Sequence, residues 1–250
     1  MSAFLSKISI AVPPYKTDQT DLASFMSQAL PLDEEQSHLL KVIYRASGIQ
    51  SRYSVLEDFQ KGHSTRFQTG KPFPSVEERM ALYKKHALPL AKQALQGLFD
   101  LCAPERISHL IVISCTGMYA PGLDIELIRS CGLPSSTERT SIQYMGCYAA
   151  FNGIKVAKNI VRSEPTARVA MVCVELCSLH LQQDVHEDAL LSNALFSDGA
   201  AATLISSEPL GNTALSLENQ YNDLYFEGIE EMSWNIGNQG FEMKLSGKVP

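Results

Sequence analysis

The sequence contains no long apolar run. Residues 7–12 are too few for the hydrophobic segment of a signal peptide, and no stretch approaches the length of a membrane span. The sequence also lacks a cluster of lysine and arginine interleaved with aromatic residues, and its net charge is -6. That balance argues against a nucleic-acid surface. We therefore expect a cytoplasmic protein with neither a membrane nor a nucleic acid as partner.

Paired cysteines are missing as well. None of the six cysteines forms a C-x-x-C pair, no histidine stands at metal-ligand spacing, and 250 residues are far more than a disulfide scaffold has. We predict reduced thiols and no metal site. With 45% hydrophobic and 19% charged residues, the chain has enough apolar material for the core of one or two domains.

Helical and extended patterns alternate along the chain, which predicts an α/β fold with mainly parallel strands. Asp33 with Gln36 and Ser75 with Glu78 have the spacing of capping boxes, so a helix is expected after each pair. Pro89 interrupts the second, long helix. Further elements are expected at 7–13, 109–114 and 168–175 (strands), 124–131 (a short helix) and from 215 onward (a strand).

Cys147 is the most informative residue. Residues 140–145 form an extended pattern, Gly146 bends the chain, and a helical pattern begins at Tyr148. A thiol at a helix N-terminus faces unpaired N–H groups and the positive end of the helix dipole, which favour a thiolate. Small residues on one side of this helix allow close packing that holds the sulfur in place; they are Ala149, Ala150, Gly153 and Ala157. We predict that Cys147 is a nucleophile.

Three segments at characteristic separations define a family resemblance. They are Gly-Cys-Tyr-Ala-Ala-Phe-Asn-Gly at 146–153, Arg-Val-Ala-Met-Val-Cys-Val-Glu at 168–175, and Leu-Phe-Ser-Asp-Gly-Ala-Ala-Ala at 195–202, interpreted as a tight polar turn. Together they resemble the thiolase superfamily, and most closely the chalcone synthase-like type III polyketide synthases. The resemblance is strongest from about residue 110 to residue 209.

The resemblance implies a thiolase-like fold, a layered α-β-α-β-α arrangement of two similar βαβαβ halves. The chain is similar to the N-terminal portion of that fold. Residues 1–212 would form the first half, and residues 213–250 would begin the second, because 238–250 resemble its opening strand and turn. Whether Pro250 is the natural end is left open.

The activity that the resemblance implies is acyl transfer. Cys147 would take an acyl group from acyl-CoA and extend it by decarboxylative condensation with malonyl-CoA. The coenzyme A thioesters are substrates, no cofactor is implied, and the protein would be a homodimer. In the family, a histidine and an asparagine of the second half complete the site, and no residue of this sequence matches either one.

Pocket residues follow from the same resemblance. Phe196 corresponds to a gating phenylalanine, and His180 to a polar residue beside the starter pocket. Trp234 stands where plant enzymes typically have glycine, so it would fill part of the cavity, or it is an ordinary core or interface residue. His180 would hydrogen-bond a substrate, or it is a satisfied histidine at a strand end. The other cavity-lining positions are Cys115, Cys177, Ser192 and Met243.

Charged residues have two predicted roles. Arg52, and with it Arg45, resembles the basic stretch that contacts coenzyme A phosphates, although arginines at helix ends are usually solvated surface charges. Glu175 ends a hydrophobic strand beside the expected site. A buried carboxylate requires hydrogen bonds or a cation, so we expect Glu175 to orient its neighbours rather than to act as a base.

Two other functions compete with this hypothesis. A β-ketoacyl-carrier-protein synthase III-like enzyme shares the cysteine turn and the fold, but it should show a basic docking face. A truncated, non-catalytic homologue that acts as a binding subunit would explain the missing histidine and asparagine, and it predicts an unreactive Cys147. The segments at 148–152 and 195–199 favour the type III polyketide synthases over the carrier-protein enzyme.

Overall fold

The computed structural model describes residues 2–249. The chain forms two compact units, each assembled from segments that are distant in sequence. The first unit contains the chain up to Val12, Lys84–Glu175 and Gly199–Asp223; the second contains Pro13–Tyr83, Leu176–Asp198 and the chain from Leu224 onward. The boundary predicted after residue 212 is one between the two halves of the thiolase-like fold, which is a different kind of division from these two units. It stays a prediction. Pro250 lies outside the described residues.

The first unit is built on a six-stranded sheet in the order β5-β4-β6-β7-β1-β8. β4 runs parallel to β5 and β6, whereas β1 runs antiparallel to β7 and β8. The predicted α/β fold with parallel strands is therefore confirmed, with an antiparallel strand added at the β1 side. The elements are β1 (Phe4–Ala11), η2 (Pro104–Arg106), β4 (His109–Ser114), α4 (Leu123–Cys131), β5 (Glu138–Gln143), α5 (Ala149–Ser163), β6 (Arg168–Leu176), β7 (Asp198–Ser206) and β8 (Leu215–Ser216).

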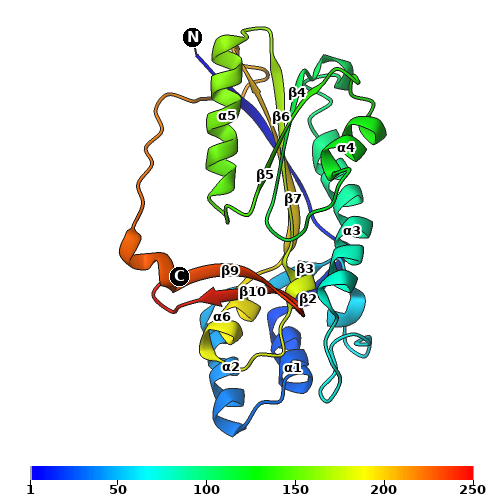
Figure 1. The fold of residues 1–250 in the computed structure, drawn as a ribbon, viewed down its shortest axis with the longest axis vertical. Helices are drawn as coiled ribbons and strands as arrows, with labels where there is room; N and C mark the ends of the chain where they lie inside the picture. Colours follow the sequence, from blue (N-terminus) through cyan, green and yellow to red (C-terminus); the bar gives the residue numbers. More distant parts are fainter. Residues whose placement is uncertain (1, 250) are drawn as a thin grey trace. The chain divides into compact units, whose positions relative to one another are not determined.

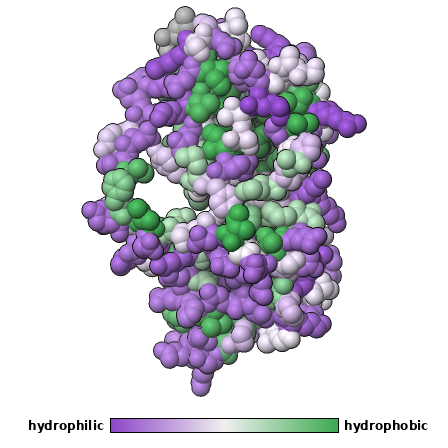
Figure 2. Space-filling model, in the orientation of Figure 1, coloured by the Kyte–Doolittle hydropathy of each residue, from purple (hydrophilic) through white to green (hydrophobic). Residues whose placement is uncertain are grey.

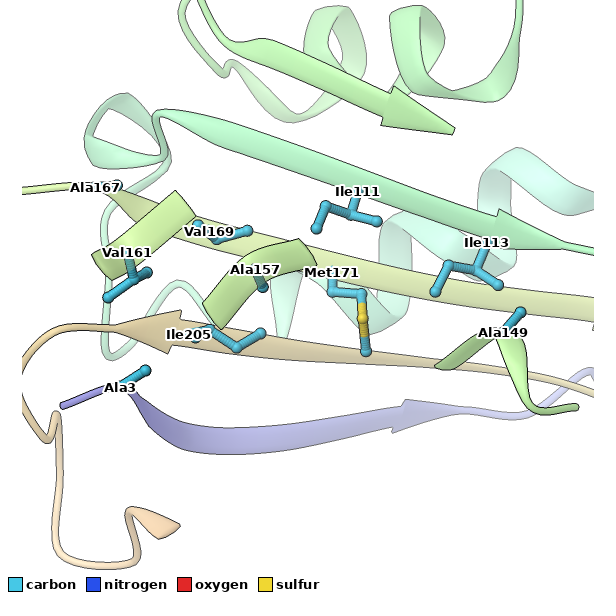
Figure 3. Close-up of a cluster of buried hydrophobic side chains, with 10 residues drawn as sticks. All are labelled: Ala3, Ile111, Ile113, Ala149, Ala157, Val161, Ala167, Val169, Met171 and Ile205. Carbon is cyan, nitrogen blue, oxygen red and sulfur yellow. The ribbon is translucent and has the colours of Figure 1, made fainter. Parts of the chain in front are cut away.

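Helices cover both faces of this sheet. α5 lies on one face, and α4 lies on the other with the part of α3 (Val76–Gln96) that follows Lys84 (Figure 1). The apolar core under α5 joins side chains from the helix and from four strands or their ends (Figure 3). Its buried members are Ala3, Ile111, Ile113, Ala149, Ala157, Val161, Ala167, Val169, Met171 and Ile205.

Gly153 shows how closely α5 approaches the sheet. A Cβ atom at this position would lie 2.5 Å from Met171 Sδ and 2.6 Å from Ile113 Cδ1, closer than non-bonded carbon and sulfur atoms approach. The small residues predicted on one side of this helix therefore do face the sheet, and Ala149, Gly153 and Ala157 are buried. This close packing fixes the start of α5 relative to β4 and β6.

The second unit contains the remaining helices and two small antiparallel sheets, β2-β3 and β9-β10. Both predicted capping boxes are present, since Asp33 and Gln36 bond reciprocally at the start of α2, as do Ser75 and Glu78 before α3. Its elements are β2 (Tyr15–Asp18), α1 (Gln19–Ala29), α2 (Glu34–Ala46), β3 (Ser51–Ser54), η1 (Glu57–Phe59), η3 (Cys177–His180), α6 (Glu187–Leu195), η4 (Phe226–Glu231), β9 (Met232–Gly237) and β10 (Gly240–Leu245).

The polar turn predicted at 195–202 is shorter than expected. β7 begins at Asp198, so the small residues that follow are strand residues rather than turn residues. Ala200, Ala201 and Ala202 pair with Ala11, Ile10 and Ser9 of β1. Antiparallel pairing with a neighbouring strand supplies the backbone hydrogen bonds that the local sequence alone does not reveal.

Apolar side chains also reach the surface of each unit. They include Ile8, Ile10 and Phe151 in the first unit and Leu224, Phe226 and Ile229 in the second. Figure 2 shows hydrophobic residues, in green, at the surface among hydrophilic ones. Single exposed apolar residues are common on protein surfaces. Among the described helices, none combines the length and the apolar character needed to cross a membrane.

Candidate active site

Cys147 lies in the turn between β5 and α5, directly before Tyr148, the N-cap residue of α5. The strand-turn-helix prediction is confirmed, although the strand ends at Gln143 rather than at residue 145. Two residues adopt the left-handed conformation, Tyr144 at φ 58° and Gly146 at φ 66°. A tyrosine rarely adopts this conformation. The turn presents the Cys147 side chain to the surface of the first unit, where it is exposed.

Cys115, in the loop directly after the neighbouring strand β4, holds this turn. The Gly146 N–H donates to Cys115 Sγ at 3.2 Å, and the Cys115 thiol lies 3.8 Å from the Gly146 carbonyl oxygen. Burial, and then the charge of Glu175, raise the pKa of the Cys115 thiol. Cys115 therefore stays protonated at neutral pH and contacts Gly146, the residue before Cys147. Its predicted role in lining the cavity stays a prediction.

Glu175 anchors the loop after β4. Its two carboxylate oxygens accept from the Cys115 N–H at 2.9 and 3.0 Å, and one accepts from Thr116 Oγ1 at 2.7 Å. Burial raises the pKa of Glu175 to about 7, although these hydrogen bonds oppose the shift. The carboxylate thus finds the partners that burial requires. A chain of contacts then runs from Glu175 through Cys115 to Gly146, next to Cys147.

The second unit brings three predicted pocket residues together. His180 stacks on Phe241 with ring centroids 4.3 Å apart and meets Trp234 edge to face at 5.5 Å. The Phe241 N–H donates to His180 Nδ1 at 3.1 Å, which leaves the proton of a neutral imidazole on Nε2. Met243 pairs with Trp234 across β10 and β9. These contacts explain why His180 is buried, and the sequence did not indicate Phe241 as its partner.

Three further pocket predictions also fall in the second unit. Ser192 is buried on α6, and its hydroxyl donates to the Ala189 carbonyl of the same helix at 3.0 Å. Phe196 is the C-cap residue of α6 and is half-buried. Cys177 begins η3 and is half-buried. Their roles toward a substrate stay predictions.

Arg52 forms hydrogen bonds with other residues of the second unit. Its guanidinium donates to the carbonyl oxygens of Asn193 and Phe196, both at 2.7 Å, to Gln19 Oε1 at 2.9 Å and to Tyr44 Oη at 3.3 Å. These bonds tie the C-terminal end of α6 to β3. Arg45 is exposed in the last turn of α2, so of the two predicted arginines it has the charge more open to a phosphate.

Asp198 is a buried carboxylate to which the sequence analysis gave no role. It accepts from the Val55 N–H at 2.8 Å, the Ser178 N–H at 2.7 Å and the Ser178 hydroxyl at 2.5 Å. Burial raises its pKa to about 6. The signal was present in the sequence, since an aspartate directly before the apolar run of β7 must find hydrogen-bond donors. Which segments supply them depends on the fold.

The predicted site residues divide between the two units. Cys147, Cys115 and Glu175 belong to the first unit. The others belong to the second, namely Arg45, Arg52, Cys177, His180, Ser192, Phe196, Trp234 and Met243. In the first unit, His109 stands at the amino end of β4, whereas Cys147 follows the carboxyl end of the parallel strand β5. His109 is thus a full strand length from the thiol.

Comparison with known proteins decides the family. The model of the N-terminal domain of chalcone and stilbene synthases matches residues 2–209. The chain belongs to this family. The family match includes the Cys147 turn, the strand that ends at Glu175 and the segment around Asp198, the three segments on which the sequence resemblance rested.

Relatives of the chain include the alpha-pyrone synthesis polyketide synthase-like Pks18 of Mycobacterium tuberculosis, 28% identical, with 99% of the chain and 64% of the relative covered. The 1,3,6,8-tetrahydroxynaphthalene synthase of Streptomyces peucetius is 26% identical, with coverages of 98% and 64%. The chain therefore spans slightly less than two thirds of the length of these relatives.

Solved structures confirm the thiolase-like type III polyketide synthase fold. The type III polyketide synthase domain of Steely1 from Dictyostelium superposes with a TM-score of 0.89 at 25% identity, covering 100% of the chain and 69% of the domain. PKS-I from the brown alga Ectocarpus siliculosus gives a TM-score of 0.83 at 29% identity, with coverages of 100% and 68%.

Proposed function

We propose that this chain carries the acyl-loading nucleophile of a type III polyketide synthase. The observation that carries the proposal is the exposed Cys147 thiol at the start of α5, in a turn held by Gly146, Cys115 and Glu175. Membership of the chalcone and stilbene synthase family and similarity to polyketide synthases support it.

The reaction has two steps with balanced chemistry. The Cys147 thiolate attacks the carbonyl carbon of an acyl-CoA, and coenzyme A leaves as its thiolate, which takes up a proton. Malonyl-CoA then loses carbon dioxide, and the resulting enolate attacks the acyl-cysteine carbonyl, which releases the Cys147 thiolate. The histidine and asparagine that would stabilise the thiolate and the oxyanion have no match in these 250 residues.

The second unit would supply contacts to the substrates. We propose that Trp234, packed on His180 and Phe241, reduces the space available to the growing chain and favours a short product. Phe196, Cys177, Ser192 and Met243 would complete the lining. Arg45 would contact a coenzyme A phosphate, with Arg52 positioning the end of α6. We propose that no cofactor takes part and that the protein acts in the cytoplasm as a homodimer, to which the exposed apolar residues would contribute contact surface.

Covalent loading tests the proposal directly. The protein is incubated with an acyl-CoA and its intact mass is measured, followed by mapping of the modified peptide. We expect one acyl adduct on Cys147, its loss in Cys147→Ala, and its retention in Cys131→Ala, which alters a buried cysteine of the same unit. No adduct on Cys147 would favour a non-catalytic binding protein. Loading from an acyl-carrier protein but not from acyl-CoA would favour a carrier-protein enzyme instead.

A further inference from the structure

A second group of reactive side chains lies at the amino end of the parallel strands in the first unit. His109 and Glu138 are the first residues of β4 and β5 and are register partners. Glu164, the C-cap residue of α5, joins them. His109 Nε2 lies 3.6 Å from a Glu138 carboxylate oxygen and 3.9 Å from one of Glu164. One atom from each of the three residues falls within 4.8 Å of the other two.

The imidazole of His109 is held in one orientation. It is 5% exposed, and Nδ1 lies 2.9 Å from the Ser108 hydroxyl. That hydroxyl also accepts from the Arg168 N–H at 3.0 Å and lies 3.4 Å from the Arg168 carbonyl oxygen. Ser108 thus holds the ring at Nδ1. The other ring nitrogen, Nε2, points toward the two carboxylates.

His109 Nε2 and the two carboxylate oxygens are all atoms that can coordinate a cation, and they converge within 4.8 Å of one another. Among the described residues, Nε2 has no hydrogen-bond donor within bonding distance. The nearby arginines are engaged elsewhere, Arg139 with Asp124 at 2.6 Å and Arg168 with Glu208. The C-terminal end of α5, where Glu164 stands, adds the negative end of a helix dipole. Each of these features favours a positive charge.

We propose that His109, Glu138 and Glu164 bind a divalent transition-metal ion, with Zn²⁺ as the best fit. One imidazole nitrogen and two carboxylate oxygens are ligands that Zn²⁺ accepts, at bond lengths of about 2.0–2.2 Å, with a fourth position for water. Ser108 is the outer partner that orients the histidine ligand. Both glutamates are exposed, with 72% and 55% of their side chains accessible, so they can close on the ion.

This ion would connect three elements. β4 leads to the Cys115 loop, β5 leads to the Cys147 turn, and α5 begins just after Cys147 and ends at Glu164. A metal at the opposite end would therefore stabilise the same strands and helix that position the nucleophile, without touching it. The site stands independently of the acyl transfer proposed above.

Metal titration of the whole chain tests the site. Cys147→Ala serves as the background, because an exposed thiol also binds Zn²⁺. We expect one Zn²⁺ per chain by isothermal titration calorimetry, and at about 100 times Kd a rise in Tm of roughly 5 °C. Glu138→Gln and Glu164→Gln should each raise Kd at least about tenfold. Mg²⁺ should not bind, since it prefers all-oxygen sites.

The matched control is Glu105→Gln, an exposed glutamate of the same unit, which should leave the Zn²⁺ affinity unchanged. The two glutamine variants alter exposed side chains and should fold normally, whereas His109 is buried and a substitution there risks unfolding. The proposal is overturned if Zn²⁺ produces no shift in Tm, or if the shift survives both Glu138→Gln and Glu164→Gln.

Discussion

The two ends of the parallel strands β4 and β5 use carboxylates in opposite ways. At the carboxyl end, Glu175 is largely buried, and backbone and hydroxyl donors surround it. At the amino end, about 20 Å away for strands of this length, Glu138 and Glu164 are exposed and face His109 Nε2. A carboxylate that is surrounded by backbone and hydroxyl donors anchors the chain. A carboxylate without such donors remains available to a ligand.

The largest expected effect is a difference in reactivity between the Cys147 and Cys115 thiols, which both lie at the carboxyl ends of β4 and β5. With iodoacetamide under native conditions, Cys147 should be alkylated at least about 100-fold faster than Cys115, because Cys147 is exposed while burial and Glu175 keep Cys115 protonated. A time course of peptide mass spectrometry measures both rates in one sample. Equal rates would contradict the difference in environment between the two thiols.

The buried carboxylate should make stability depend on pH. Because the folded-state pKa of Glu175 is raised to about 7, the native state keeps a proton between about pH 4.5 and pH 7 that the unfolded state has lost. Its contribution to stability is full below pH 4.5 and falls as pH rises to 7, by about 2–3 kcal/mol. Urea unfolding of Glu175→Gln should lack this decline.

Asp198 provides the control for that measurement. Its pKa is raised to about 6, so its own decline in stability is complete at lower pH. Asp198→Asn should therefore make the decline below about pH 6 less steep, with the part due to Glu175 remaining, and leave the change between pH 6 and 7.5 in place. If Glu175→Gln keeps the wild-type change between pH 6 and 7.5, Glu175 is not the group responsible.

Helix α5, which runs between the two ends of the parallel strands, packs closely on the sheet at Gly153, and a larger side chain there should disrupt this packing. Gly153→Val places atoms against Met171 and Ile113, and we expect a loss of about 2 kcal/mol in the free energy of unfolding from overpacking. Lys155→Val makes the same kind of side chain at an exposed position of α5 and should have a much smaller effect. Similar losses in the two variants would point to β-branching in the helix rather than to close packing.

The smallest expected effect is on the stability of a variant at the amino ends of β4 and β5, measured without metal. At pH 8 with a chelator present, Glu138→Gln should change the free energy of unfolding by less than about 0.5 kcal/mol, because its side chain is 72% exposed and solvent screens its charge. The same substitution at Glu175 removes a buried anchor. Comparing the two urea midpoints sharpens the contrast between an anchoring carboxylate and one that is available to a ligand.

The local sequence was sufficient to predict those helices and strands that have a short-range pattern, such as a capping box or an apolar run. The capping residues Asp33 and Ser75 set helix starts through contacts three residues away, and continuous apolar runs marked β4 and β6. The strand within 238–250 was expected, but its pairing with β9 and the helix α6 were missed. Hydrophobic residues of these elements pack on residues far along the chain, as Phe241 does on His180. No short-range sequence pattern therefore predicts these elements.

The sequence by itself determined the family and the strand-turn-helix around Cys147, because Gly146 and the small residues of α5 act through local conformation. The role of Cys147 as a nucleophile stays a prediction. Only the tertiary structure decided the partners of Arg52, the anchoring of Cys115 by Glu175, and the meeting of His109 with Glu138 and Glu164. Parallel pairing of β4 with β5 brings Glu138, 29 positions from His109, beside it, and the end of α5 brings Glu164, 55 positions away, to the same end of the strands. These approaches are properties of the fold rather than of any local segment.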